Sequence, residues 1–311
     1  MSKYFDQSNM FMEPDVTQHG SHMVMTNVVK PTKTKYLTLD TRFCDGYDLN
    51  TKANYTLTLP ERVNNVRSMH LRNIEIPLTF YNISACLGNN TFKMKILLSE
   101  TTIIIPDGQY TEAELESKIN DLLSLEGPPF NDITIAITGK KATITNGGSI
   151  NPCTITFDEA PINYLGVKSQ APSDSTISRL GWKLGYKKKS YEIAALEGKT
   201  AESFVYINGP RYLYLIVDEF TNGNPHSFLG LSTTSQLASQ QILARISIDY
   251  NLYPFGSTFT AEKHSYSLSD IRRYSNEVDI QRLNIRLVDE FGKVIDLNGT
   301  DISMCLELEH L

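Results

Sequence analysis

The chain has 311 residues, of which 41% are hydrophobic and 21% are charged, and its formal net charge is −6 at pH 7. This length fits either one large β domain or two smaller ones, and the apolar fraction suffices for a real core. The acidic balance argues against a protein whose main task is to neutralise nucleic-acid phosphates, although a local basic patch is compatible with it.

The four cysteines lie far apart in the sequence, at Cys44, Cys86, Cys153 and Cys305. None belongs to a CxxC motif or stands at metal-ligand spacing from a histidine, so we expect free thiols in a reducing compartment. The sequence shows no basic-then-apolar leader and no stretch long enough to cross a bilayer. These features predict a soluble protein made in the cytosol.

Residues 1–34 mix Met, Asn, Gln and His with single prolines, and they follow neither the helical nor the strand period. We expect an extended N-terminal arm here. Strands are then expected over 36–40, 55–59 and 66–80. Pro60 closes the second of these strands, and Pro77 makes the far end of the third an edge or a bend.

Residues 88–168 are predicted to form a self-contained α+β insert. Strands are expected over 91–98 and 102–105, and a hairpin over 133–145 turns at Gly139-Lys140. Between them Thr111 and Glu114 form a capping box, and apolar residues follow at helical spacing before Gly127. The apolar stripe of this helix consists of Leu115, Ile119, Leu122 and Leu123.

After a Ser/Pro/Asp linker beyond Ala171, further strands are expected over 203–207, 211–218, 241–248 and 284–287. The segment 281–309 alternates with a period of two, breaks at Gly292 and turns again at Asn298-Gly299, which predicts a C-terminal β-hairpin with one buried face. Many short strands and few helices indicate a mainly β fold, a jelly-roll β-sandwich formed by 35–87 and 169–311.

No motif for catalysis or phosphate binding is present, since the sequence lacks GxSxG, GxGxxG and GxxxxGK[ST]. The paired carboxylates Asp218-Glu219 and Asp289-Glu290 could serve a glycosidase, but polar strand ends at turns explain them better. None of the cysteines has the context of a nucleophile. We therefore expect no catalytic residues and no enzyme activity.

Metal and nucleic-acid sites are equally weakly indicated. Possible metal ligands are His19 and His22 with nearby Asp15, but a solvated arm is the better interpretation, and no cofactor is expected. The remaining histidines, His70, His226, His264 and His310, stand alone. Lys187-Lys188-Lys189, flanked by Tyr186 and Tyr191, could touch a nucleic acid or an acidic protein. A lysine run beside a strand more often protects a sheet edge.

Several segments together resemble the jelly-roll minor capsid proteins of nucleocytoplasmic large DNA viruses. The resemblance spans almost all of 33–308 in the expected order, and it is carried by residues 33–43, 59–66, 74–77, 80–84, 105–111, 180–186, 210–215, 287–292 and 296–299. Each motif alone is a strand or a turn, and their succession is the specific feature. The resemblance implies no catalytic residues.

The resemblance implies a structural protein of a large icosahedral virion, made in the host cytoplasm. Its expected partners are the major capsid protein, other minor capsid proteins and further copies of itself, with no specific nucleic acid and with possible proximity to an inner viral membrane. The alternatives are a penton or vertex capsomer, and a host-attachment sandwich that binds glycans through Asp218, Glu219 and Tyr253. A glycosidase on a β scaffold is the remote third class.

Overall fold

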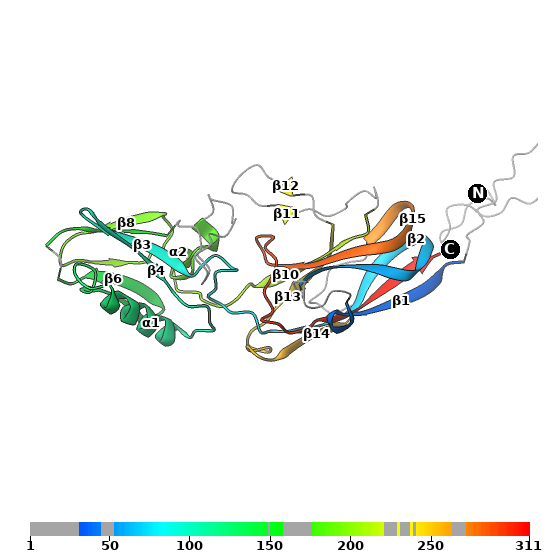
Figure 1. The fold of residues 1–311 in the computed structure, drawn as a ribbon, viewed down its shortest axis with the longest axis horizontal. Helices are drawn as coiled ribbons and strands as arrows, with labels where there is room; N and C mark the ends of the chain where they lie inside the picture. Colours follow the sequence, from blue (N-terminus) through cyan, green and yellow to red (C-terminus); the bar gives the residue numbers. More distant parts are fainter. Residues whose placement is uncertain are drawn as a thin grey trace, which may run out of the picture.

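The computed structural model describes residues 31–44, 53–148, 150–157, 176–220, 241–262 and 272–311, and the backbone of 229–230 and 237–238. It has two parts, a β-sandwich and an insert, which lie side by side along the longest axis of the molecule (Figure 1). Each part has its own cluster of buried apolar side chains.

The sandwich consists of two antiparallel sheets of four strand segments each. The first has the order β1 (Lys33–Asp40), β16 (Ser303–His310), the C-terminal half of β2 (Asn54–Pro77) and β14 (Thr258–Glu262). The second has the order N-terminal end of β2, β15 (Arg272–Val288), β10 (Tyr212–Asp218) and β13 (Ile242–Ser247). Eight segments in this order form a jelly roll, so the predicted mainly β, jelly-roll fold is confirmed.

Strand β2 has 24 residues and belongs to both sheets, which makes them continuous. Its pairing with β15 is interrupted where Val63 lies opposite Ile280 but Thr58 lies opposite Arg282. Four residues of β2 thus oppose a single residue of β15, and such a bulge bends a strand. The prediction that Pro60 ends a strand was wrong, because Pro60 lies in this bulge, where no ladder hydrogen bond is needed.

The alternation over 281–309 is confirmed, but the predicted hairpin is wrong. Strand β15 pairs with β2 and β10, whereas β16 pairs with β1 and β2. The two strands therefore lie in opposite sheets and contribute to one core, with their buried side chains being Leu283, Ile285, Leu287, Met304, Leu306 and Leu308. Alternation reports that a strand has a buried face, and it does not identify the partner strand.

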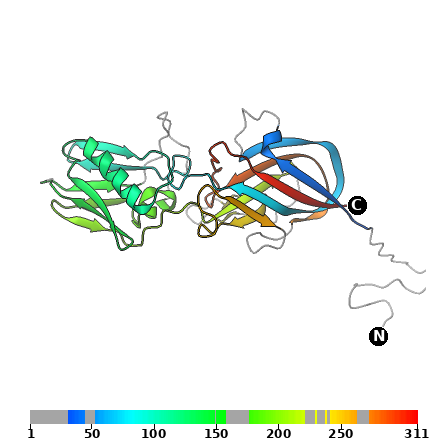
Figure 2. The same ribbon diagram turned by 90° about the horizontal axis from the view of Figure 1, so that it is seen from below.

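The insert leaves the sandwich after β2 and returns before β10. One of its sheets has the order β4 (Ser99–Ile104), β3 (Thr91–Ile96), β7 (Cys153–Thr156) and β8 (Ser190–Ile193). The other has the order β5 (Ile133–Thr138), β6 (Lys141–Asn146) and β9 (Gly198–Thr200). Helix α1 (Glu112–Leu125) lies across these strands (Figure 2). The remaining elements are η1 (Thr41–Phe43), η2 (Thr176–Ser178), α2 (Leu180–Lys183), β11 (Leu229–Gly230) and β12 (Leu237–Ala238).

The insert extends beyond the predicted boundary at residue 168. Strands β8 and β9 pair with β7 and β6, and Tyr186, Val205 and Ile207 belong to the core of the insert. These strands have four and three residues, and their partners lie far back in the sequence, so local periodicity carries little of this information. The predicted strand over 203–207 is an extended segment instead, held by hydrogen bonds from Val205 N to Lys140 O and from Tyr206 N to Lys183 O.

Helix α1 begins and ends as the sequence predicts. Thr111 Oγ1 accepts a hydrogen bond from Glu114 N, and Glu114 Oε2 accepts one from Thr111 N at 2.8 Å, so the capping box is confirmed. The side chain of Asn120 on α1 protects the free edge of β5. Its amide accepts a hydrogen bond from Ile135 N at 2.8 Å and donates one to Ile135 O at 2.9 Å. Satisfying an edge strand in this way removes a template for unwanted sheet pairing.

We predict that Asn120→Ala destabilises the insert by about 1–3 kcal/mol, because it leaves two backbone groups of β5 without their partners. Chemical denaturation followed by circular dichroism measures this loss. Ser117→Ala, an exposed position on the same helix, is the matched control and should shift the midpoint little. Equal midpoints for the two variants would contradict the edge-protection role.

Candidate functional site

The first carboxylate pair, Asp218-Glu219, is part of the framework of the sandwich. Glu219 is buried, and its Oε2 lies 2.8 Å from Arg272 Nη1. Arg272 also donates to Val217 O at 2.9 Å and to Gln241 O at 2.6 Å, so it links β10, the start of β15 and the segment before β13. Burial raises the pKa of Glu219, while the Arg272 charge opposes that rise.

The glycan site expected from Asp218, Glu219 and Tyr253 is not formed by these residues. Tyr253 follows the end of β13, which pairs with the start of β10, whereas Asp218 ends β10. The two ends of this seven-residue strand are about 20 Å apart. The Tyr253 ring packs edge-on against Phe259 at 5.0 Å and belongs to the border of the sandwich core. The attachment hypothesis therefore loses the residues on which it was based.

The second pair, Asp289-Glu290, shapes the loop between β15 and β16. Asp289 is buried, and its Oδ1 accepts hydrogen bonds from Phe291 N and Lys293 N, both at 2.8 Å. Burial raises the pKa of Asp289 to about 6. Glu290 Oε2 lies 3.6 Å from Arg211 Nε. The turn thus holds the carboxylate of Asp289, and the ion pair with Arg211 holds that of Glu290.

This loop meets the insert in a group of charged residues that we call the junction cluster, consisting of Arg179, Lys183, Asp289, Glu290 and Lys293. Lys293 Nζ donates to Leu87 O at 2.7 Å, and Arg179 Nη1 donates to Gly88 O at 3.3 Å. Lys183 Nζ donates to Asn208 O at 2.6 Å, and burial lowers the pKa of Lys183 to about 8 against the attraction of Glu290. The cations of the cluster thus hold the two segments that connect the sandwich to the insert, at Leu87-Gly88 and at Asn208.

The space beside the junction cluster is too small for a substrate. A cavity of about 20 Å³ lies there between Phe80, Cys86, Asp107 and Ile295, which leaves room for about one water molecule. Cys86 Sγ donates to Val294 O at 3.3 Å, and burial raises the pKa of Cys86 to about 11. The thiol is therefore held in its unreactive, protonated form at neutral pH.

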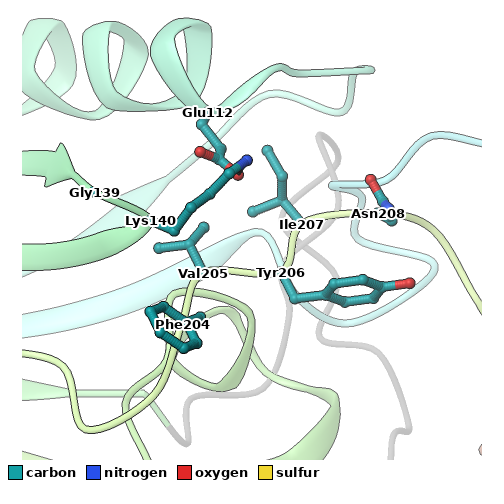
Figure 3. A pocket seen from close by; sticks show the side chains of 8 residues that line it. All are labelled: Glu112, Gly139, Lys140, Phe204, Val205, Tyr206, Ile207 and Asn208. Carbon is teal, nitrogen blue, oxygen red and sulfur yellow. Dashed lines mark hydrogen bonds and ion pairs between the residues drawn. The ribbon is translucent and has the colours of Figure 1, made fainter.

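A larger hollow of about 430 Å³ opens on the insert (Figure 3). Its walls are the start of α1, the β5–β6 turn and the extended segment 204–208. Lys140 Nζ and Glu112 Oε1 form an ion pair at 2.7 Å, and the rings of Phe204 and Tyr206 point away from this pair in Figure 3. The two charges neutralise each other, so the hollow offers no activated nucleophile or base.

The basic-aromatic cluster is divided between the core and the surface. Tyr186 is buried, its ring stacks on Phe157 at 5.3 Å, and its hydroxyl donates to Lys199 O at 2.8 Å. The Tyr191 hydroxyl accepts from Lys187 N and Lys188 N, both at 2.8 Å. These rings belong to the core of the insert and offer no face for stacking with a base, contrary to a nucleic-acid surface built on them.

The remaining candidate residues are the four cysteines, Asp15 and the histidines. All four cysteines are free thiols, as predicted, and Cys153 is buried with its pKa raised to about 11. Asp15, His19, His22, His226 and His264 lie outside the described residues. Within the described ranges, no group of three or more His, Cys, Asp or Glu side chains could hold a metal ion. No helix in the same part of the chain is long and apolar enough to cross a membrane.

The chain matches no family model and no curated protein sequence. Among solved structures, it is similar to the mavirus penton protein with a TM-score of 0.41 and 11% identity, over 91% of this chain and 100% of that one. It is also similar to a chain in the Sputnik virophage structure, with a TM-score of 0.39 and 12% identity, over 90% and 98%. At TM-scores below 0.5 these likenesses assign no function, and the fold rests on the strand order described above.

We predict that Arg272→Ala lowers the free energy of unfolding by roughly 3–5 kcal/mol, because it leaves Glu219 as a buried carboxylate without its cation. Replacing both residues by methionine should recover most of the loss. Arg273→Ala is the exposed neighbouring control, and urea denaturation is the measurement. A loss no greater than that of the control would show that the ion pair is not structural.

We further predict a pH-dependent contribution from Asp289. The pKa of Asp289 is higher in the folded chain than the ordinary 3.8, so the folded state binds the proton more tightly than the unfolded state does. The resulting contribution to stability is fully present below pH 3.8. The contribution, roughly 2–3 kcal/mol, is lost as the pH rises through about 6. Asp289→Asn keeps the acceptor for Phe291 N and Lys293 N and should abolish this step in denaturation curves between pH 4 and 7.

Asp296→Asn, an exposed carboxylate of the same loop, is the control and should keep the pH dependence of the unaltered chain. An identical slope for Asp289→Asn and Asp296→Asn would contradict the assignment of the step to Asp289.

Proposed function

We propose that this chain is a structural, non-enzymatic protein of a viral capsid, acting as a minor component that packs against major capsid proteins. The observation that carries the proposal is the strand order of the sandwich, an eight-segment jelly roll, which is an architecture common to viral capsid and lectin domains. A fold alone does not assign a function, so the choice between a capsid and a lectin role rests on the individual residues.

The positions of the carboxylates and of the expected glycan-binding residues favour a capsid role over an enzymatic or a lectin role. The carboxylates that could have served a glycosidase are occupied by Arg272, by backbone N–H groups and by Arg211. The three residues proposed for glycan binding are divided between two ends of a sheet. The sequence resemblance to minor capsid proteins extends through both the sandwich and the insert, which a shared sandwich alone would not produce.

The arrangement of the two parts suits a shell protein. The insert occupies one end of the sandwich, and the start of β1 and the C-terminus lie at the other (Figures 1 and 2). A sandwich with the insert at one end and with β1 and the C-terminus at the other presents separate surfaces to neighbours in a shell. The partners under this proposal are major and minor capsid proteins and further copies of this chain.

The proposal is tested by quantitative mass spectrometry of purified virions. The chain should be present at a fixed ratio to the major capsid protein and should remain after washes that remove adsorbed host proteins. A copy number equal to that of the vertices alone would favour the penton alternative. Absence from purified virions, or turnover of a glycoside by the purified chain, would refute the structural role.

The predicted arm falls mainly on residues outside those described, so its role as a tether stays a prediction. We expect deletion of 1–32, which stops just before β1, to leave the circular dichroism spectrum of the fold intact and to abolish incorporation into particles. Replacement of 1–32 by a Gly/Ser segment of equal length is the control for arm length. Normal incorporation of the deleted chain would contradict the tether.

A further inference from the structure

Some lysines of the insert have a carboxylate partner and others have none. Lys93 forms an ion pair with Glu100, and Lys140 forms one with Glu112. Four further lysines form no ion pair with a carboxylate in the part of the chain that the structure describes, namely Lys141, Lys187, Lys188 and Lys199. Their positive charge is therefore available to a ligand.

The topology of the insert separates these lysines from its acidic helix. Helix α1 lies against β5 and carries four carboxylates, Glu112, Glu114, Glu116 and Asp121. Lys199 belongs to β9, which is at the opposite edge of the sheet from β5. Lys187-Lys188 lies just before β8, which is the edge strand of the other sheet. Figure 1 shows α1 and β8 on opposite sides of the insert, so its charge is polarised.

A series of contacts gathers the four lysines around one carboxylate, that of Glu202. Lys141 Nζ donates to Glu202 O at 3.1 Å. The backbone N–H groups of Lys187-Lys188 donate to the Tyr191 hydroxyl, both at 2.8 Å, and this hydroxyl donates to Glu202 Oε2 at 2.8 Å. Lys199 Nζ lies 6.0 Å from the centre of the Tyr191 ring. Four cations around one carboxylate leave a local excess of positive charge.

Two exposed aromatic rings adjoin these lysines. Phe204 is 65% exposed and Tyr206 is 49% exposed, and buried Val205 lies between them in the extended segment. Residues two apart in an extended segment point to the same side. Lys141 Nζ lies 5.6 Å from the centre of the Phe204 ring. Protection of a sheet edge explains a run of lysines but not exposed rings beside it. We call the four lysines with Phe204 and Tyr206 the lysine face.

The composition of the lysine face indicates the class of its ligand. Lysine is depleted in protein–protein interfaces, which favour arginine. Its ammonium is a point charge that attracts phosphates without reading a sequence. Exposed rings provide stacking platforms for unpaired bases, and a basic surface with such rings is the common design for binding single strands. A sulfated glycan would also attract the lysines, but it has no base to stack on the rings.

We propose that the lysine face binds single-stranded nucleic acid without sequence preference. Phosphates contact the four lysines, and bases stack on Phe204 and Tyr206. The binding is weak and salt-dependent, in keeping with a chain whose net charge is −6. This activity goes beyond the capsid role and belongs to the purified chain. A chain that binds the strand but is absent from virions would refute the structural proposal alone.

The test is fluorescence anisotropy of labelled oligo(dT) with the purified full-length chain, between about 50 and 200 mM salt. Four phosphate contacts predict a slope of about −3 for log K against log salt concentration. The double variant Lys188→Gln/Lys199→Gln should bring this slope to about −1.4. Lys33→Gln/Lys95→Gln, at two exposed positions outside the lysine face, is the matched control and should keep the slope of the unaltered chain.

The rings are tested with Phe204→Ala/Tyr206→Ala, which should weaken oligo(dT) binding at least about fivefold and leave the salt slope unchanged. Phe43→Ala, at a ring of the sandwich that is 82% exposed, is the matched control and should keep the full affinity. Because all these side chains are on the surface, the thermal unfolding midpoints of the variants should equal that of the unaltered chain.

The proposal is overturned if oligo(dT) does not bind, if the lysine variant keeps the full slope, or if the ring variant binds as tightly as its control. Heparin and poly-glutamate distinguish the other polyanions. Heparin binding should be the same for the ring variant and the unaltered chain, and an equal loss for heparin and oligo(dT) would contradict base stacking. Tighter binding of poly-glutamate than of oligo(dT) would make the lysine face a docking site for an acidic protein segment.

Discussion

The sandwich depends on β2 pairing in two sheets at once. Its N-terminal end fixes β15 in one sheet, and its C-terminal half fixes β16 and β14 in the other. The bulge around Pro60 sets the point at which the strand passes between them. Because the insert begins where β2 ends and returns where β10 begins, the same strand places the insert at one end of the sandwich. The long-range pairing of β2 with the last strands of the chain thus determines the shape of the whole molecule.

Charged side chains take part in this architecture instead of forming a reactive site. Arg272 joins three segments of one sheet and neutralises Glu219, and Asp289 organises the loop from which Lys293 reaches the segment that leads into the insert. Buried ionic groups of this kind are costly unless paired, and they hold a particular geometry more than they add stability. Their perturbed pKa values follow from burial at structural joints, so a shifted pKa alone was not a signal of catalysis here.

Local patterns in the sequence predicted local structure well. The Thr111–Glu114 capping box identified α1, and the alternation of Leu283, Ile285 and Leu287 identified a strand with one buried face. Pairing could not be read in the same way, because partners such as β7 and β8 are separated by more than thirty residues. The insert boundary was misplaced for that reason. The exposed Leu97-Leu98 turn between β3 and β4 was not expected from the sequence, because such a hairpin turn normally takes glycine or asparagine.

We propose that this chain is built into a viral shell through its sandwich. A cryo-electron microscopy reconstruction of the virion, at a resolution that traces the backbone, tests it most directly. The account predicts ordered density for the eight-segment sandwich in symmetric contact with capsid proteins, with the insert projecting from one end. Density that accounts for the entire shell without this chain would contradict the claim.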